Sequence, residues 1–428
     1  MSTAGAAIGL GNIWRFPYIT GKYGGSAFVI VFMINIVIIA IPLLIAEIAL
    51  GRCAQSDAVG TFEELGGKRW RYVGVLAIIS SFLILSYYTV ITGWTLMYMF
   101  NSLTGLADAA AAGKTVEFFN VFASDPYRVV FYQAVVIFIC ILVLYRGIAS
   151  GIEKMCKFMI PLLFVILIML VIRSLMLPGA VKGLNFLLKP DFSKLSYDCV
   201  LEAVGQAFYS SSLACGGMIT YGSYLGKDEN IPTMSCFILF LNTLVAIFSG
   251  FIIFSAVFSF GGNVDAGPSL IFVTLPDVFA RMAFGKVFSF TFFALLFLAA
   301  ITSAFSLLEV LVSFGIDHLK WTRQKSVIIM GGAIALFGLP SALSVGGHFP
   351  QIYGKDFLDA VDFIINNVAL PIGGIFTAIF VGWFWKKSKN EVTNHGKLRF
   401  RFYKAWLWMC RVIAPLFIAF MFIKGLKW

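Results

Sequence analysis

The chain of 428 residues is 60% hydrophobic and only 12% charged, a composition that excludes an ordinary soluble domain and indicates an integral membrane protein. Its net charge of +11 does not indicate a nucleic-acid binder, because the basic residues form short clusters between apolar runs rather than a basic groove interleaved with aromatic residues. Seven cysteines without a CxxC pair support neither a disulfide framework nor a zinc site.

The first apolar segment, residues 2–23, contains glycine where a membrane helix should be continuous. Residues 4–16 read AGAAIGLGNIWRF. Because backbone N–H and C=O groups cannot stay unpaired in hydrocarbon, a helix interrupted there must line a cavity or hold a ligand. Opened carbonyls can bind a cation, and the N-terminus of a half-helix can bind an anionic group. We therefore expect the functional site at this interruption.

Ten further segments are long and apolar enough to cross a bilayer. They cover residues 26–51, 72–104, 127–147, 154–176, 198–225, 231–261, 284–318, 324–345, 355–386 and 401–425. The sixth segment of the chain is interrupted at residues 210–217, which read SSSLACGG. The first and sixth segments are thus both broken, and paired interruptions of this kind are typical of secondary transporters.

This spacing predicts an all-α membrane fold of eleven helices in one transporter domain, residues 1–428. Two five-helix repeats, about 1–176 and 198–386, are followed by an extra helix at about 401–425. Because five is odd, consecutive copies insert with opposite orientation, which is the inverted repeat expected of alternating-access carriers. Helices 1 and 6 are expected to be unwound near the middle of the membrane.

Lysine and arginine gather in the loops after the second, fourth, eighth and tenth segments, which lie on one side of the membrane in this count. They are Arg52, Lys68, Arg69, Arg71, Arg146, Lys154, Lys157, Lys320, Arg323, Lys325, Lys386, Lys387, Lys389, Lys397, Arg399 and Arg401. The positive-inside rule makes this side cytoplasmic, with the N-terminus inside. We expect a multi-pass protein of the cell membrane, with external loops at 105–126, 177–197 and 262–283.

Four motifs stand in order along the chain. They are GLGNIWRFPY at Gly9–Tyr18, GGSAF at Gly24–Phe28, GQAFYSSSLACGGMITYGSY at Gly205–Tyr224 and AAITSAFS at Ala299–Ser306. Together they resemble the neurotransmitter:sodium symporter family, including the bacterial leucine-transporter-type amino-acid carriers. The resemblance runs from the first residue through the tenth segment, and eleven spans rather than twelve are found among bacterial members. It implies a transporter and not an enzyme.

The resemblance also implies two sodium sites. Asn12, Ser210 and Asn242 each offer a neutral oxygen from a different apolar segment, where such groups are costly unless paired. By similarity they form the first site, together with the carbonyl of Ala7 and the substrate carboxylate. The second site is implied to comprise the carbonyls of Gly5, Ile8 and Ala299 and the hydroxyls of Thr302 and Ser303. The alternative is ordinary hydrogen bonding between membrane helices.

The same resemblance indicates the class of substrate. Gly9 occupies the position where monoamine-carrying members have an aspartate, so it implies an amino acid, which brings its own carboxylate. That carboxylate is expected to meet the N–H groups of Leu10 and Gly11 and the Tyr88 hydroxyl. The amine is expected to meet carbonyls near Ala7, Tyr209 and Ser210 and the Ser212 hydroxyl.

The same resemblance implies that the pocket for the substrate side chain is lined by Ile84, Phe208, Tyr209, Cys215, Ser303 and Leu307. Cys215 stands where the leucine-carrying relative has a phenylalanine. We therefore expect a neutral L-amino acid with a bulky hydrophobic or aromatic side chain, unless neighbouring residues refill the space.

Two pairs of residues resemble the family's gates. Arg15 and Asp362 match the extracellular gate, with Tyr88 and Tyr209 as a lid over the substrate; a static buried ion pair is the alternative. Asp317 and Tyr224 match the cytoplasmic gate, whose usual partner is an arginine upstream of the first helix. Only eight residues precede Gly9, about 12 Å of helix against roughly 30 Å of bilayer core. We expect either an internal methionine of a longer reading frame or a natural truncation.

Other features leave the mechanism open. Chloride-dependent members have a serine and a tyrosine where this chain has Ala246 and Phe32, and the carboxylate of many chloride-independent members is also missing, so chloride is not predicted. Glu47 and Glu309 are interpreted as partners of nearby polar groups rather than as proton relays. A proton-coupled amino-acid carrier and a non-transporting amino-acid sensor remain as alternatives to sodium symport.

Overall fold

The computed structural model describes residues 2–264, 270–352 and 354–425, and in these residues the chain is folded into helices joined by short connections. Nine helical stretches of the described residues are long and apolar enough to cross a membrane. They are Ser26–Ala54, Arg71–Asn101, Pro126–Tyr145, Ile148–Leu175, Ile231–Phe260, Gly285–Asp317, Arg323–Ser344, Phe357–Phe384 and Tyr403–Lys424. The two other predicted segments, the first and the sixth, are present as pairs of shorter helices. The predicted eleven-segment all-α fold is confirmed.

The first half of the chain contains ten α-helices and three π-helical turns, which are labelled η. In chain order they are α1 (Ser2–Ala7), η1 (Gly11–Arg15), α2 (Phe16–Lys22), α3 (Ser26–Asn35), η2 (Ile36–Ala40), α4 (Ile41–Ala54), α5 (Ala58–Gly66), α6 (Arg71–Asn101), α7 (Gly105–Ala111), α8 (Thr115–Ala123), α9 (Pro126–Tyr145), η3 (Ile148–Glu153) and α10 (Lys154–Leu175).

A connecting helix and a short 3₁₀ turn lead into the second half. They are α11 (Ala180–Leu188) and η4 (Phe192–Lys194). The described elements that follow are α12 (Tyr197–Ser210), α13 (Gly217–Ser223), α14 (Ile231–Phe260), η5 (Leu270–Thr274), α15 (Leu275–Ala280), α16 (Gly285–Asp317), α17 (Arg323–Phe337), α18 (Leu339–Ser344), α19 (Phe357–Ile364), η6 (Ile365–Ala369), α20 (Leu370–Ile379), η7 (Phe380–Phe384), α21 (Ser388–Val392), α22 (Tyr403–Trp408), η8 (Met409–Ile413) and α23 (Ala414–Gly425).

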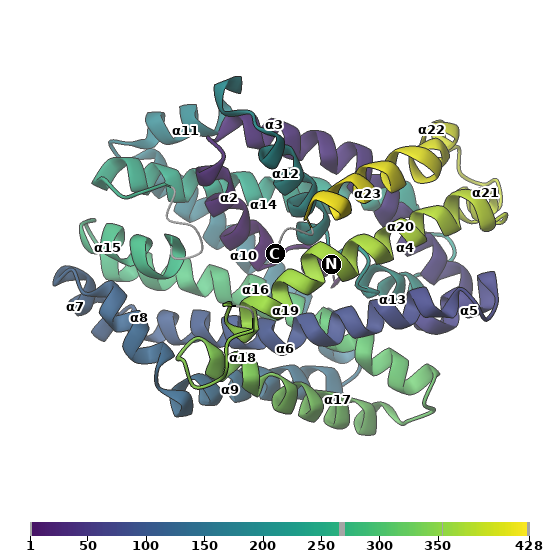
Figure 1. The fold of residues 1–428 in the computed structure, drawn as a ribbon, viewed down its shortest axis with the longest axis horizontal. Helices are drawn as coiled ribbons and strands as arrows, with labels where there is room; N and C mark the ends of the chain where they lie inside the picture. The colour runs from purple at the N-terminus through teal and green to yellow at the C-terminus, as the bar shows by residue number, and fades with distance from the viewer. Residues whose placement is uncertain (1, 265–269, 353, 426–428) are drawn as a thin grey trace.

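Helices α6 and α16 form the centre of the bundle and run side by side through it (Figure 1). Their most apolar stretches are 72% and 89% buried, whereas those of α9, α17 and the Tyr403–Lys424 span are between 28% and 39% buried. A helix that is apolar on all sides is stable only when other helices or lipid surround it. The central pair therefore provides the frame against which the two broken segments are held, and the outer helices face lipid.

The short helices lie at the two ends of the bundle (Figure 1). Helices α5, α13, α21 and α22 lie at one end, which we call the α5 end, and α7, α8, α11 and α15 lie at the other, the α7 end. Most of these helices occupy loops for which the sequence analysis predicts no structure. The basic loops around α5 and α21 are thus at the opposite end from the predicted external loops. Residues 265–269 of the external loop predicted at 262–283 lie outside the described residues.

Close backbone contact holds the second half of the broken sixth segment in place. Helix α13 crosses α4 at Gly51, where an added Cβ would overlap the carbonyl oxygen of Ile219. A Cβ at Gly222 would likewise overlap the carbonyl oxygen of Ile48. Small residues at such a crossing allow two membrane helices to pack backbone to backbone. The position of α13, and of the interruption just before it, therefore depends on glycine.

Candidate functional site

The interruption of the first segment lies between α1 and η1, at residues 8–10. The backbone groups freed here are bonded by other segments. The Leu10 N–H donates to the Tyr88 hydroxyl of α6 at 3.2 Å, and the Ser212 hydroxyl donates to the carbonyl of Ala6 at 2.9 Å. Side chains of α6 and of the interrupted sixth segment thus replace hydrogen bonds that the first helix lacks, as membrane burial requires.

The interruption of the sixth segment lies between α12 and α13, and its backbone is unusual. Ser212, Ala214 and Gly216 have φ angles of 51°, 61° and 76°, in the left-handed region. Non-glycine residues adopt this conformation at a cost, and such residues cluster at functional sites. The Glu47 carboxylate accepts a hydrogen bond from the Ala214 N–H at 2.7 Å, and the Ser81 hydroxyl donates to the carbonyl of Cys215 at 2.5 Å. Glu47 therefore has the structural contact expected of it.

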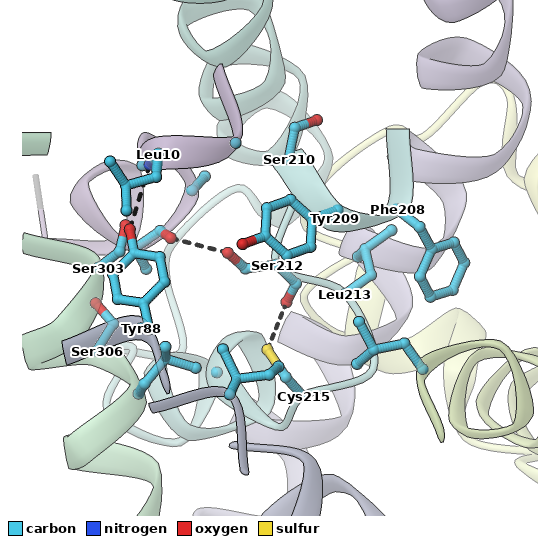
Figure 2. Close-up of a pocket in the computed structure, with 18 residues that line it drawn as sticks. Leu10, Tyr88, Phe208, Tyr209, Ser210, Ser212, Leu213, Cys215, Ser303 and Ser306 are labelled. Atoms are coloured by element: carbon cyan, nitrogen blue, oxygen red, sulfur yellow. Dashed lines mark hydrogen bonds between the residues drawn. The ribbon is translucent and has the colours of Figure 1, made fainter. Parts of the chain in front are cut away.

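The two interruptions face each other across a cavity of about 50 Å³. Figure 2 shows Leu10 and Tyr88 on one side of it, Ser212 and Cys215 on another, and the Tyr209 ring over the space between them. The structure brings together around this cavity all twelve residues predicted to bind substrate, which are Ala7, Leu10, Gly11, Ile84, Tyr88, Phe208, Tyr209, Ser210, Ser212, Cys215, Ser303 and Leu307.

Six more residues line the cavity that were not predicted as substrate contacts. They are Ala6, Gly9, Leu213, Gly217, Ser306 and Leu370. Leu213 and Gly217 lie in or beside the second interruption, so the motif around them was a usable signal. Leu370 opens α20 in the tenth segment, and nothing in the sequence around it indicates that this segment reaches the cavity.

The residues proposed for the first sodium site lie together. Asn12 Nδ2 lies 2.5 Å from Asn242 Oδ1 and 3.3 Å from the carbonyl oxygen of Ala7. Asn12, Asn242 and Ser210 are buried, and within the described ranges the Asn12 Oδ1 and Ser210 Oγ atoms have no hydrogen-bond partner. Unpaired buried oxygens are costly. These neutral oxygens fit a hard cation, which would satisfy them.

The residues proposed for the second sodium site also lie together, where α16 meets the first interruption. The Ser303 hydroxyl lies 3.2 Å from the carbonyl oxygen of Ile8 and 3.5 Å from that of Gly5. The Thr302 hydroxyl, one residue earlier, lies 3.1 Å from the carbonyl oxygen of Ala299. All five residues of this proposed site are buried. Their carbonyl and hydroxyl oxygens suit a hard cation rather than a soft metal.

Arg15 and Asp362 line one vestibule of about 520 Å³ on the α7 side of the cavity, but among the described residues no ion pair joins them. Arg15 instead donates to Gln206 at 2.8 Å and pairs with Glu202 at 3.3 Å, and its guanidinium lies 5.4 Å from the centre of the Tyr209 ring. Asp362 accepts from Asn366 at 2.8 Å. The expected outer pair is therefore not formed in this arrangement.

Glu202 and Gln206, the partners of Arg15, are residues that the sequence analysis missed. They stand four residues apart on α12, so they share one face of that helix. The spacing of two polar residues within an apolar segment was the available signal.

The residues matched to the inner gate do not contact each other. The Tyr224 hydroxyl donates to Glu309 at 2.9 Å, and Glu309 accepts two hydrogen bonds from the Arg323 guanidinium, at 2.9 and 2.6 Å. The Asp317 carboxylate accepts from the N–H of Asp57 at 2.8 Å, in the connection before α5. Glu309 therefore has polar partners, as expected for a structural role. Tyr224 and Asp317, the two residues matched to the inner gate, make separate contacts at the α5 end.

Comparison with known proteins defines the class to which this fold and site belong. The model of the sodium:neurotransmitter symporter family matches residues 1–118 and 119–427. The chain belongs to this family, so it is a membrane transporter of the symporter type and not an enzyme.

Individual relatives cover nearly the whole chain. It is 36% identical to the uncharacterized sodium-dependent transporter YhdH of Bacillus subtilis, over 99% of this chain and 95% of that protein. It is 34% identical to an uncharacterized sodium-dependent transporter of Haemophilus influenzae, over 100% of this chain and 96% of that protein. Among solved structures, that of MhsT in complex with L-phenylalanine superposes with a TM-score of 0.91 at 43% identity, covering 99% of this chain and 97% of that one.

Proposed function

We propose that the protein is a sodium-coupled symporter of a neutral L-amino acid with a bulky hydrophobic or aromatic side chain. The observation that carries the proposal is the cavity between the two interruptions. Its eighteen lining residues include no charged side chain. A zwitterion supplies both of its own charges, so it matches a cavity whose polar groups are hydroxyls and backbone groups.

The cavity has a polar part and an apolar part, which suits an amino acid with a hydrophobic side chain. Hydroxyls of Tyr88, Ser210, Ser212 and Ser303 lie near the interruptions, where hydroxyls and backbone groups are the proposed partners of the carboxylate and the amine. The apolar part is made by Ile84, Phe208, Leu213, Leu307 and Leu370. The solved structure of MhsT is a complex with L-phenylalanine, and 43% identity over nearly the whole chain supports a related substrate here.

Coupling follows from the chemistry of the two proposed sodium sites. Sodium ions would supply positive charge beside the substrate carboxylate at Asn12, Ser210 and Asn242. Among the described residues the Asn12 Oδ1 and Ser210 Oγ atoms have no hydrogen-bond partner, and Ser210 lines the cavity. Because these ligands are neutral, a site holding both ion and carboxylate avoids the large cost of burying one charge alone. Ion and substrate therefore stabilise each other's binding, and the inward sodium gradient drives uptake.

The proposal is tested by uptake into proteoliposomes. Labelled phenylalanine, tryptophan, leucine and alanine are offered with an inward sodium gradient, and with sodium replaced by choline. Sodium-dependent accumulation of the large side chains above alanine is expected. Accumulation driven by a proton gradient without sodium would instead establish the proton-coupled carrier, and sodium-dependent binding without flux would establish the sensor.

The orientation is part of the same proposal. The α5 end carries the basic loops around α5 and α21, so the positive-inside rule assigns it to the cytoplasm. The vestibule with Arg15 and Asp362 is then extracellular, and substrate enters the cavity from that side.

A further inference from the structure

An apolar groove lies on the outside of the bundle, away from the transport cavity. It has a volume of about 440 Å³ and runs between the first turns of α6 and the helix formed by α20 and η7. Its walls include Trp70, Tyr72, Leu76, Ile372, Phe376 and Phe384. None of these residues lines the transport cavity.

The position of the groove indicates what covers it. Both walls belong to spans long and apolar enough to cross the membrane, Arg71–Asn101 and Phe357–Phe384, so the groove opens toward lipid. Tyr72, Phe376 and Phe384 are 64%, 45% and 57% exposed. Exposing large aromatic side chains to water is unfavourable, whereas contact with lipid acyl chains is not. Trp70 and Tyr72 are also the residue types that concentrate at the boundary between membrane and water.

Basic residues lie at the groove and next to its walls in sequence. Arg69 lines it, and Lys68, Arg71, Lys386 and Lys387 flank its two walls in sequence; all five are exposed. Two acidic residues, Glu63 and Glu64 of α5, precede Lys68 in the chain. With the five cations they leave a net charge of three positive units around the groove.

Most of these cations have no partner in the part of the chain that the structure describes. Among the described residues, the side chains of Lys68, Arg69, Lys386 and Lys387 form no ion pair or hydrogen bond. Arg71 differs, because its guanidinium lies over the ring of Tyr72, 5.3 Å from the centroid. Arg69 is therefore free to bind an anion at the point where the groove meets water. A guanidinium suits a phosphate, to which it can donate two parallel hydrogen bonds.

We propose that this groove binds one anionic phospholipid, with an acyl chain along Leu76, Ile372 and Phe376 and the headgroup phosphate at Arg69. The apolar walls and the free cations are matched by the two parts of one such molecule, and basic pockets between membrane helices bind acidic headgroups in this way. Lys68, Lys386 and Lys387 add attraction for the negative charge. The two helices that wall the groove also carry Ile84, Tyr88 and Leu370 of the transport cavity.

Trp70 provides a direct probe, because bromine atoms on an acyl chain quench a nearby indole. The protein has nine tryptophans, so the contribution of Trp70 is obtained by subtracting the Trp70→Phe variant. That variant keeps an aromatic ring against Phe380 and Phe384, whose ring centres lie 4.8 and 4.9 Å from that of Trp70. The full-length protein is placed in phosphatidylcholine vesicles containing a small fraction of either brominated phosphatidylglycerol or brominated phosphatidylcholine.

Stronger quenching of Trp70 by the brominated phosphatidylglycerol is expected. In Arg69→Gln the apparent affinity for this lipid should fall about fivefold, since one basic residue near the surface contributes about 1 kcal/mol. Arg146→Gln is the matched control, because Arg146 is an exposed member of the predicted cytoplasmic basic loops, is remote in sequence from the groove, and has no side-chain partner among the described residues.

Three outcomes would overturn the proposal. Equal quenching by the two lipids would mean unselective contact with the surrounding bilayer. An equal loss in Arg146→Gln would mean a general attraction of this end of the protein for negative charge. No quenching by either lipid would mean that protein, such as a second copy of the chain, covers the groove. Since none of these measurements requires transport, failure here leaves the proposed symport untouched, and the reverse also holds.

Discussion

At the scale of single residues, Gly9 determines how much room the cavity has at the first interruption. A Cβ added there would lie 2.5 Å from the Ser303 hydroxyl oxygen and 3.1 Å from that of Tyr88. Both hydroxyls are already engaged, Ser303 with the carbonyl of Ile8 and Tyr88 with the N–H of Leu10. The absence of a side chain at this position is thus a steric requirement, in addition to its place in the argument for the proposed amino-acid substrate.

We therefore expect Gly9→Ala to weaken sodium-dependent amino-acid binding by about 5- to 150-fold, corresponding to an overpacking cost of about 1–3 kcal/mol. Binding of labelled substrate to the purified protein measures the effect. Gly332→Ala is the control, since Gly332 lies in helix α17, where an added Cβ would meet open space. Unchanged binding in Gly9→Ala would show that Ser303 and Tyr88 move freely and that this contact does not shape the site.

At the scale of elements, the connection before α5 contacts the C-terminal end of α16 at the α5 end of the bundle. Asp57 is the N-cap of α5 and accepts from the N–H groups of Val59 at 2.9 Å and Gly60 at 3.3 Å. Its own N–H donates to Asp317, and its carboxylate lies 3.7 Å from His318 Nδ1. Burial raises the pKa of Asp57, and Asp317 adds to the rise, while the two backbone hydrogen bonds and His318 oppose it.

This raised pKa predicts a pH-dependent stability. Because the folded protein disfavours the ionised carboxylate relative to the unfolded chain, ionised Asp57 lowers stability above its folded pKa, and this loss disappears as the pH falls. Asp57→Asn keeps an N-cap acceptor without the charge, so it should be at least as stable as the wild type at neutral pH. Its advantage should shrink as the pH falls toward the ordinary aspartate pKa of about 3.9.

Thermal unfolding of the detergent-solubilised protein over this pH range measures the difference. Asp57→Ala should be less stable than Asp57→Asn at every pH, by about 1 kcal/mol, because it loses the cap. Asp228→Asn, at an exposed position near Lys397, controls for the removal of one negative charge. A stability difference between Asp57→Asn and the wild type that does not change with pH would contradict the prediction.

At the scale of the whole molecule, the orientation in the membrane follows from which end carries the basic loops. We expect Lys114→Cys, before α8 at the α7 end, to react with a membrane-impermeant maleimide in intact cells. Lys389→Cys, in α21 at the α5 end, should react only after the cells are permeabilised. Both side chains are exposed, so accessibility within the protein is similar.

Labelling is measured as the increase over the unchanged chain, because seven native cysteines provide a background. The opposite pattern would place the N-terminus outside and the vestibule with Arg15 and Asp362 in the cytoplasm. Such a result would reverse the proposed direction of uptake while leaving the substrate cavity as described.

The bilayer explains why the helical architecture was accessible from sequence. A span must be long enough for the hydrocarbon core, and an interruption within it must have its backbone groups bonded by something else. Both conditions are local to a segment, so the eleven segments, and interruptions within residues 4–16 and at 210–217, could be predicted from order and composition alone. The structure has the breaks at residues 8–10 and 211–216. The motif resemblance then placed twelve residues that the structure indeed gathers around one cavity.

Contacts between distant segments were decided only by the tertiary structure. Arg15 was expected opposite Asp362 but lies against Glu202 and Gln206, and Leu370 reaches the cavity from the tenth segment without any local signal. The groove beside Trp70 is likewise formed between residues of α6 and of the helix made by α20 and η7, which are about 300 positions apart in the chain. Such contacts depend on how helices far apart in sequence cross one another. The sequence by itself therefore determined which segments span the membrane and where two of them break, and packing determined which side chains meet.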